Sequence, residues 1–186
     1  MSKPAAIPGA RATLLLSLAM SLIGVGGTIG AYGILTIPPS EMEPVELVPG
    51  TAEATSAMFT AMAESPPMKA LQVGNLLASG LLIISSLLLT VRRETAIWWA
   101  KQALVANVLY TLANAIGTVW FAHGHPELVD AMFTQSGQAV PEDAPTLLAH
   151  AIGTSCGASI MVGLYAVMLR IALRPDVRSF VSREAS

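Results

Sequence analysis

The chain has 186 residues, of which 53% are hydrophobic and 12% are charged, and its formal net charge is −2. A soluble domain carries about twice this share of charged side chains, so the composition excludes an ordinary globular surface and favours an integral membrane protein. It also excludes a nucleic-acid partner, because such binding needs a basic patch on a soluble face and only a short cationic tail is available.

Four long apolar stretches predict four membrane-spanning helices. They cover approximately residues 12–37, 70–91, 98–121 and 146–169. A helix of about 20 apolar residues crosses the ~30 Å hydrocarbon core of a bilayer, so each stretch is long enough. A cleavable signal peptide is the alternative for the first stretch, but its apolar part would have about 7 to 15 residues and a small-residue cleavage site. The longer first stretch therefore predicts an uncleaved span.

Small residues mark the faces on which the spans are expected to pack. In lipid, helices associate through small residues that allow close approach, and through polar contacts. The first span carries Gly26, Gly30 and Gly33 on one side, and the fourth carries Gly153 and Gly157. Both sets predict helix-packing seams.

Polar side chains form two stripes at helical spacing, one on the second span and one on the third. Residues three and four apart share a helix face, and a polar face is costly toward lipid. We therefore expect both stripes to point into the bundle, where they either bond between helices or line a polar pocket. The second span offers Gln72, Asn75, Ser79 and Ser86; the third offers Asn107, Tyr110, Thr111, Asn114 and Thr118.

The third span is also bounded by aromatic residues. Trp98 and Trp99 precede its apolar part, and Trp120 and Phe121 follow it. Aromatic rings concentrate at the two membrane interfaces, and about 21 residues at 1.5 Å each give roughly 32 Å between these belts. Lys101 lies just inside the first belt, where its long side chain can reach the headgroups.

Two outer loops, residues 38–69 and 122–145, and a cytoplasmic tail, residues 170–186, complete a single membrane domain over 1–186. Apolar residues at helical spacing predict a short amphipathic helix within 51–64, stopped by Pro66-Pro67, and another over 126–133. Both would lie on the outer membrane face or cap the bundle. The tetrapeptide Ala-Met-Phe-Thr occurs at 57–60 and at 131–134, which raises the hypothesis of a duplicated hairpin.

The tail begins with Arg170, Arg174 and Arg178 at four-residue steps. These arginines could form a cationic helical face along anionic lipid. The simpler interpretation is a signal that stops translocation of the chain.

The charged residues are distributed asymmetrically about the four spans. Lys and Arg beside a span resist translocation, and nine of the ten basic residues fall on one side, whereas nine of the twelve acidic residues fall on the other. This predicts cytoplasmic amino and carboxyl termini. The basic set is Lys3, Arg11, Arg92, Arg93, Lys101, Arg170, Arg174, Arg178 and Arg183, with Lys69 as the outer exception. A bacterial inner membrane is the expected location, since no organelle address is visible and Arg outnumbers Lys.

All three histidines fall at one predicted outer edge: His123 and His125 follow the third span and His150 begins the fourth. Imidazole nitrogens could hold a metal there, with Glu127 or Asp130 completing the set, or a haem could be held between two of them. No spacing here matches a motif of defined geometry, so no cofactor is predicted.

No catalytic constellation is present. Cys156 is the sole cysteine, which excludes an intramolecular disulfide, and a thiol without a basic neighbour stays inert. The spans contain no Asp or Glu, so a carboxylate proton relay has no candidate.

The sequence therefore predicts an all-α integral membrane protein, a four-transmembrane-helix bundle with short amphipathic helices in its outer loops. The expected function is that of a non-enzymatic accessory, scaffold or self-associating subunit, with membrane lipids and a protein partner or a second copy as its contacts. Binding or transport of a small neutral or apolar molecule through a polar-lined interior is the alternative. A metal- or haem-binding redox protein is a third hypothesis.

Overall fold

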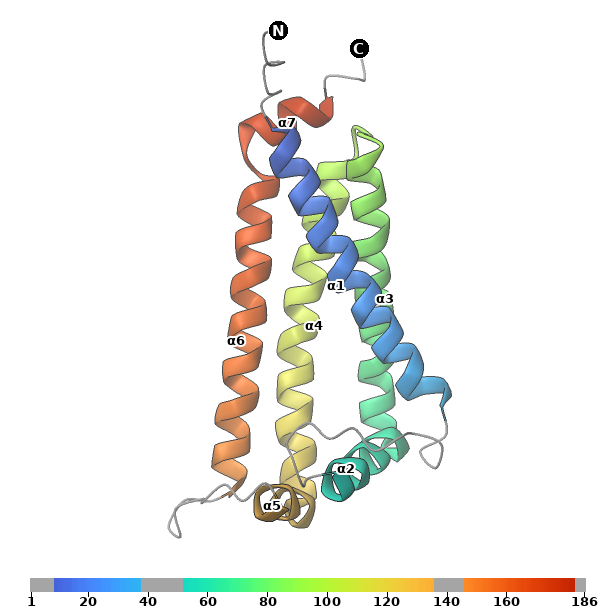
Figure 1. Ribbon diagram of the computed structural model, residues 1–186, viewed down its shortest axis with the longest axis vertical. Helices are drawn as coiled ribbons and strands as arrows, with labels where there is room; N and C mark the ends of the chain where they lie inside the picture. The colour runs from blue at the N-terminus through green and yellow to red at the C-terminus, as the bar shows by residue number, and fades with distance from the viewer. Residues whose placement is uncertain (1–8, 38–51, 136–145, 183–186) are drawn as a thin grey trace, which may run out of the picture. The chain divides into compact units, whose positions relative to one another are not determined.

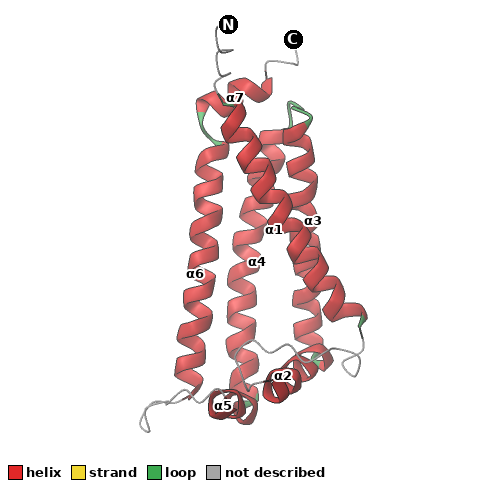
Figure 2. Ribbon diagram, viewed as in Figure 1, coloured by secondary structure: helices red, strands yellow, loops and turns green. Residues whose placement is uncertain are grey.

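The computed structural model describes residues 9–37, 52–135 and 146–182. The helices of these ranges (Figure 1) are α1 Ala10–Thr36, α2 Ala52–Glu64, α3 Pro66–Thr90, α4 Ala96–Gly124, α5 Pro126–Gln135, α6 Thr146–Ala172 and α7 Pro175–Ser182. No strand occurs in the described part of the chain, where only short loops and turns separate the helices (Figure 2).

Four of the helices, α1, α3, α4 and α6, have 25 to 29 residues and windows of mean hydropathy between 1.4 and 1.9. They are long and apolar enough to cross a membrane, which confirms the four predicted apolar helices. Their ends agree with the predicted spans to within a few residues, and the largest difference is at α3, which begins at Pro66 rather than near residue 70.

The prediction that Pro66-Pro67 stops the preceding helix agrees with the structure, and the same two prolines also begin the next helix. α2 already ends at Glu64, and both prolines form the first turn of α3. Proline is well suited to this position, because the first N–H groups of a helix have no intrahelical acceptor and the fixed φ of proline is helical. The two prolines therefore separate the short helix α2 from the long helix α3, which they start.

The chain divides into two compact units, each of which contains a segment of all four long helices. Within the described residues, unit 1 comprises 9–30, 75–110 and 161–182, and unit 2 comprises 31–37, 52–74, 111–135 and 146–160. The buried core of unit 1 draws on α1, α3, α4, α6 and α7. Its members are Leu16, Met20, Leu82, Leu89, Ala96, Ala100, Ala103, Leu104, Tyr165, Met168, Ala172 and Val181.

In unit 2 the two short helices contact each other and pack beside the ends of longer ones (Figure 1). Met58 of α2 forms a buried cluster with Met68 at the start of α3 and Phe121 near the end of α4, and Met62 and Met132 pack against it. Both occurrences of the repeated tetrapeptide therefore lie in helices, at 57–60 in α2 and 131–134 in α5. The unbranched thioethers of methionine fill such irregular spaces well.

The C-terminal segment corrects the prediction of one cationic helical face. α6 ends at Ala172, and α7 is a separate helix from Pro175, so Arg170 and Arg178 lie on different helices with Arg174 between them. Proline cannot donate its backbone hydrogen bond and disfavours helical geometry in the preceding residue. The four-residue spacing of the three arginines therefore does not place them on one helix face.

α7 belongs to unit 1 and packs against the rest of that unit through one of its sides. Val177, Phe180 and Val181 are buried, and the Arg92 guanidinium lies 4.2 Å from the centre of the Phe180 ring. At the start of α1, Gly9 has φ +85, and a Cβ there would overlap the Asp176 carbonyl oxygen and lie 3.1 Å from Cβ of Phe180. Only glycine fits both this backbone conformation and this close approach.

Gly9→Ala should therefore release α7 from unit 1. A left-handed conformation costs a residue with a side chain about 1–2 kcal/mol, and the overlap with Asp176 adds to this, so the undocked population should rise on the order of tenfold. The measurement is the rate of trypsin cleavage after Arg178 in the detergent-purified protein, since cleavage of a docked helix requires opening. Gly26→Ala is the matched control, because a Cβ there meets no atom within 4 Å. Equal cleavage rates for the two variants would contradict the docking role of Gly9.

Candidate functional site

The third-span stripe begins with Asn107, which lies at a buried junction of three helices in unit 1. Asn107 is 2% exposed. Its side-chain amide donates hydrogen bonds to the carbonyl oxygens of Ala78 on α3, at 2.9 Å, and Ala103 on its own helix, at 2.8 Å. The hydroxyl of Tyr165 on α6 donates to the Asn107 side-chain oxygen at 3.5 Å. Asn107 therefore links α4 to both α3 and α6.

The stripe on the second span contacts α1. Asn75 donates from its amide to the carbonyl oxygen of Gly27 at 3.4 Å, and the buried Ser79 hydroxyl donates to the Asn75 side-chain oxygen at 3.1 Å. Gln72 is also buried. The hydrogen bonds of Asn75 and Ser79 are thus made to protein groups within unit 1.

The remaining stripe residues on α4, Tyr110, Thr111, Asn114 and Thr118, are half-buried. The Thr118 hydroxyl donates to the Asn114 carbonyl oxygen at 2.8 Å, within the same helix. Of the polar stripes on α3 and α4, the structure therefore places Ser86, Ser79 and Asn107 deepest, each at most 2% exposed.

A second set of hydroxyls connects α1 to α3; it includes the predicted stripe residue Ser86, whereas its partners on α1 and Thr90 were not predicted. The Ser17 hydroxyl donates to the Ser86 carbonyl oxygen at 3.0 Å and lies 2.8 Å from the Thr90 hydroxyl, while the Ser21 and Ser86 hydroxyls bond to each other. The sequence does carry a signal for this face, because Thr13, Ser17, Ser21 and Gly24 follow at steps of four, four and three. Hydroxyl-bearing and small residues in phase on one helix mark an interhelical contact in lipid.

The close approach between α1 and α3 uses Gly24 and Gly27, not the three predicted glycines. A Cβ at Gly24 would lie 2.9 Å from the Ser79 carbonyl oxygen and 2.8 Å from an Ile83 side-chain carbon. A Cβ at Gly27 would overlap the Ser79 hydroxyl. At Gly26 and Gly30 nothing lies within 4 Å, and Gly33 meets only Ile37 of its own chain segment. Among the described residues, no other helix therefore packs closely against the three glycines of the predicted α1 seam.

The three predicted histidines lie on α4, just after it, and on α6. No group of three His, Cys, Asp or Glu residues suited to a metal ion occurs within residues 9–37, 52–135 and 146–182. His125 lies 3.5 Å from the Glu127 carboxylate and stacks on Phe121, with ring centres 4.5 Å apart. His150 is half-buried on α6. The described residues thus supply no three-ligand centre for the metal hypothesis.

The α6 segment of unit 2 presents the most open apolar face. Only 11% of the most apolar window of α6 is buried, the lowest share of the four long helices. Ile152 is 56% exposed and Ile160 is 72% exposed, and Cys156 between them is exposed as well. A Cβ at Gly153 or Gly157 would meet no atom within 4 Å.

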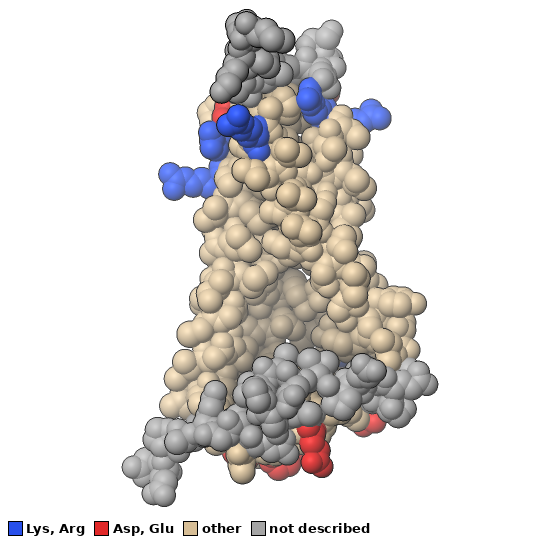
Figure 3. Space-filling model, viewed as in Figure 1, with Lys and Arg blue, Asp and Glu red and all other residues tan. Residues whose placement is uncertain are grey.

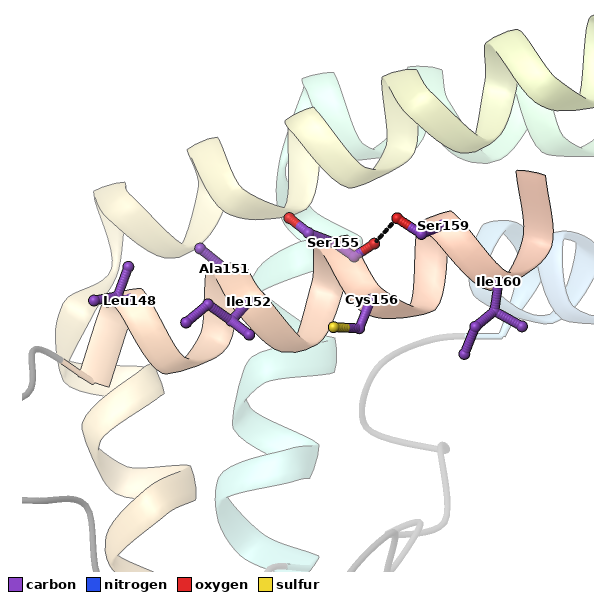
Figure 4. A pocket seen from close by; sticks show the side chains of 7 residues that line it. All are labelled: Leu148, Ala151, Ile152, Ser155, Cys156, Ser159 and Ile160. Carbon is purple, nitrogen blue, oxygen red and sulfur yellow. Dashed lines mark hydrogen bonds between the residues drawn. The ribbon is translucent and has the colours of Figure 1, made fainter. Parts of the chain in front are cut away.

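A shallow apolar groove follows this face, lined only by α6 side chains (Figure 4). The Ser159 hydroxyl donates to the Ser155 carbonyl oxygen of the same helix at 2.8 Å, so it does not need a partner from outside. The residues that line the groove include small ones, and none of them is charged. We define the open α6 face by Leu148, Ala151, Ile152, Gly153, Ser155, Cys156, Gly157, Ser159 and Ile160.

Four long apolar helices, two short helices packed together in unit 2 and a docked C-terminal helix in unit 1 are the features of a helical protein of the multi-pass membrane type. No protein-family profile, characterised protein or solved structure matches the chain.

Proposed function

We propose that the chain is a non-enzymatic subunit of a membrane assembly that acts through helix–helix contacts, and that a second copy of the chain is the first occupant of the open α6 face. The observation that carries this proposal is that, among the described residues, no atom beyond the adjoining turns of α6 itself lies within 4 Å of a Cβ at Gly153 or Gly157. Glycines four apart on an apolar helix allow two helix backbones to approach closely in lipid. A face that no described residue covers at these two glycines offers a contact surface to another helix.

A two-fold symmetric contact suits this face because the same residues would meet each other. Most oligomers of identical subunits use such self-complementary interfaces. Ile152, Cys156 and Ile160 follow at four-residue steps beside the two glycines (Figure 4). Large apolar side chains of one copy could therefore pack over the glycines of the other.

Charge supports the proposed topology, in which both termini are cytoplasmic in a bacterial inner membrane. Among the described residues, unit 1 contains seven Lys or Arg and two carboxylates, whereas unit 2 contains Lys69 and four carboxylates. Basic residues beside spans stay on the cytoplasmic side, so unit 1 would face the cytoplasm. In this proposed topology, the loops of the chain that contain α2 and α5 are the translocated ones.

The polar stripe supports packing more than a ligand pocket. Asn107, Asn75 and Ser79 direct hydrogen bonds to groups of the neighbouring helices or of their own helix. Interhelical bonds of this kind are worth about 0.6 to 2 kcal/mol in membranes. They therefore account for these polar residues without a small molecule in the interior.

The single cysteine gives a direct test of the α6 contact. Oxidation of native membranes with copper phenanthroline should convert the protein into a disulfide-linked dimer through Cys156, since a symmetric contact brings the two thiols within the Cα separation of about 4.4–6.8 Å that a disulfide needs. The measurement is the dimer band on a non-reducing gel. It should disappear in Cys156→Ser and in Gly153→Leu/Gly157→Leu.

Cys156→Ser/Ile116→Cys is the matched control for random collision. Ile116 lies on α4 and is 71% exposed, so its replacement presents an exposed thiol on a different helix. The proposal requires little dimer from this variant. Absence of the Cys156 dimer, or equal cross-linking through position 116, would overturn it.

A further inference from the structure

Unit 1 carries a concentrated positive charge at one end (Figure 3). The described basic residues lie at the start of α1, around the turn between α3 and α4, and from the end of α6 into α7. They are Arg11, Arg92, Arg93, Lys101, Arg170, Arg174 and Arg178, against the carboxylates of Glu94 and Asp176. The described residues of this unit therefore carry a net charge of +5, obtained as seven minus two.

Two of these cations are already engaged within the unit. Arg174 donates two hydrogen bonds to the Asp176 carboxylate, at 3.1 and 2.8 Å. The hydrogen bonding from Arg174 lowers the pKa of that carboxyl, so the pair stays ionised and its charges cancel. Arg92 stacks on Phe180.

The other five cations have no such partner among the residues that the structure describes. Arg11, Arg93, Lys101, Arg170 and Arg178 are exposed, and none of them forms an ion pair with a carboxylate in the described part of unit 1. Several like charges at one end of a unit repel one another, and a negative partner would relieve this repulsion. An anionic partner from outside the unit would therefore be attracted to the exposed cations.

The apolar surroundings identify the chemistry of that partner. Val91 is 61% exposed and Trp98 is 55% exposed, beside Arg93 and Lys101 in the sequence. α7 turns its apolar side inward and leaves Arg178 exposed on its other side. Exposed tryptophan and aliphatic side chains adjoining cations are typical of the level at which lipid headgroups lie. A partner that offers both phosphate and hydrocarbon satisfies both kinds of group.

We infer that the exposed cations of unit 1 bind the phosphates of anionic phospholipids, so that this end of the protein is a site for acidic lipid headgroups. Arginine suits this role because its planar guanidinium donates two parallel hydrogen bonds to a phosphate. Each Lys or Arg near an anionic lipid surface contributes about fivefold in affinity, converted from about 1 kcal/mol per residue. This inference requires membrane placement but not self-association through α6.

The test is native mass spectrometry of the full chain released from micelles containing equal amounts of phosphatidylglycerol and phosphatidylcholine. The wild-type protein should retain phosphatidylglycerol preferentially. Arg170→Gln/Arg178→Gln should reduce this preference by about 25-fold, the product of two lost contributions of about fivefold each. Raising the salt concentration should weaken the preference as well, because screening acts on exposed charges.

Three controls keep the outcome specific. Arg170→Lys/Arg178→Lys retains the charges and should keep most of the preference, and Lys69→Gln, which removes a cation from unit 2, should leave it unchanged. Glycerol phosphate added in solution should not displace the lipid, because it lacks the acyl chains. Circular dichroism verifies that each variant keeps its helices.

Either of two results would overturn the inference: no preference for phosphatidylglycerol in the wild-type protein, or an unchanged preference in Arg170→Gln/Arg178→Gln. Displacement by glycerol phosphate would show a site for free phosphates instead. The same spectra count protein copies separately from lipids, so a monomer that retains phosphatidylglycerol would reject the α6 contact and leave the lipid site standing.

Discussion

Alanine at Gly24 and Gly27 should weaken the contact between α1 and α3 by about 1–3 kcal/mol at each position, the cost of adding carbon atoms to a well-packed interface. A Cβ at Gly24 would lie 2.9 Å from the Ser79 carbonyl oxygen, which is backbone and cannot rotate away. The measurement is the fraction of folded protein in mixed micelles as the mole fraction of dodecyl sulfate rises. Both variants should unfold at a lower fraction than the wild-type protein.

The same helix supplies the control for this prediction. Gly26→Ala and Gly30→Ala add the same atom where nothing lies within 4 Å, and alanine is the better helix former, so stability should be unchanged or slightly raised. If the Gly26 and Gly24 variants lose equal stability, the close approach of α1 and α3 is not responsible.

A second substitution should rescue one position but not the other. The Cβ of Gly27→Ala would overlap the Ser79 hydroxyl, behind which the Ser79 Cβ lies 3.2 Å away. Ser79→Ala removes that hydroxyl and should restore much of the stability lost in Gly27→Ala. It should not rescue Gly24→Ala, because the obstacle there is the backbone carbonyl of residue 79.

Asn107→Leu should lower the stability of the folded protein by about 1–2 kcal/mol, because it removes the amide that bonds α4 to α3 and the oxygen that accepts from Tyr165 on α6. The dodecyl sulfate titration measures this loss. Tyr165→Phe removes only the 3.5 Å hydrogen bond and should cost less. Asn114→Leu is the matched change on the same helix at a half-buried position, and it should cost less than Asn107→Leu.

The Asn107 variant also separates packing from ligand binding. If Asn107→Leu keeps the stability of the wild-type protein but loses a small molecule that co-purifies with it, the polar-lined interior is a binding site and the packing interpretation fails. Loss of stability or of assembly, with no change in bound small molecules, supports the proposed contact function.

The four long helices could be predicted because hydropathy and length are sufficient to define an apolar helix of membrane-spanning size. The predicted helix ends were less accurate, because prolines decide where two of the helices begin. Pro66 and Pro67 were interpreted only as the end of the short helix. They also form the first turn of α3, a position that proline favours. Pro175 was the opposite case, because the periodic arginines suggested continuity across a residue that begins a new helix.

The packing face of α1 could not be chosen from glycine spacing alone. The segment 24–30 contains four glycines, and both the Gly24–Gly27 and the Gly26–Gly30 pairs have helical spacing. Only the hydroxyl residues in phase with Gly24, namely Ser17 and Ser21, distinguish the side that faces α3. The spacing of residues within α1 does not predict which side of α1 the neighbouring helix contacts. That side is set by groups of α3, namely Ser79, Ser86 and Thr90.

The metal hypothesis illustrates the same limit in another form. His123, His125 and His150 share a predicted membrane edge, but topology fixes only the level of a residue along the bundle and not its direction around the helix. His125 turns to Phe121 and Glu127, interactions with residues four and two positions away. Such local contacts depend on side-chain geometry, which the periodicity of a sequence does not predict.

The turn between α3 and α4 has a consequence for the whole C-terminal helix. Arg92 has φ 51, a left-handed conformation that costs a residue with a side chain about 1–3 kcal/mol, and its guanidinium covers Phe180 of α7. Glycine at this position would relax the turn but would lose the contact with the Phe180 ring. The backbone of the turn therefore favours glycine, whereas the contact with α7 requires arginine. The connection between two membrane helices and the anchoring of the chain's last helix are therefore coupled, and neither can be optimised by evolution without a cost to the other.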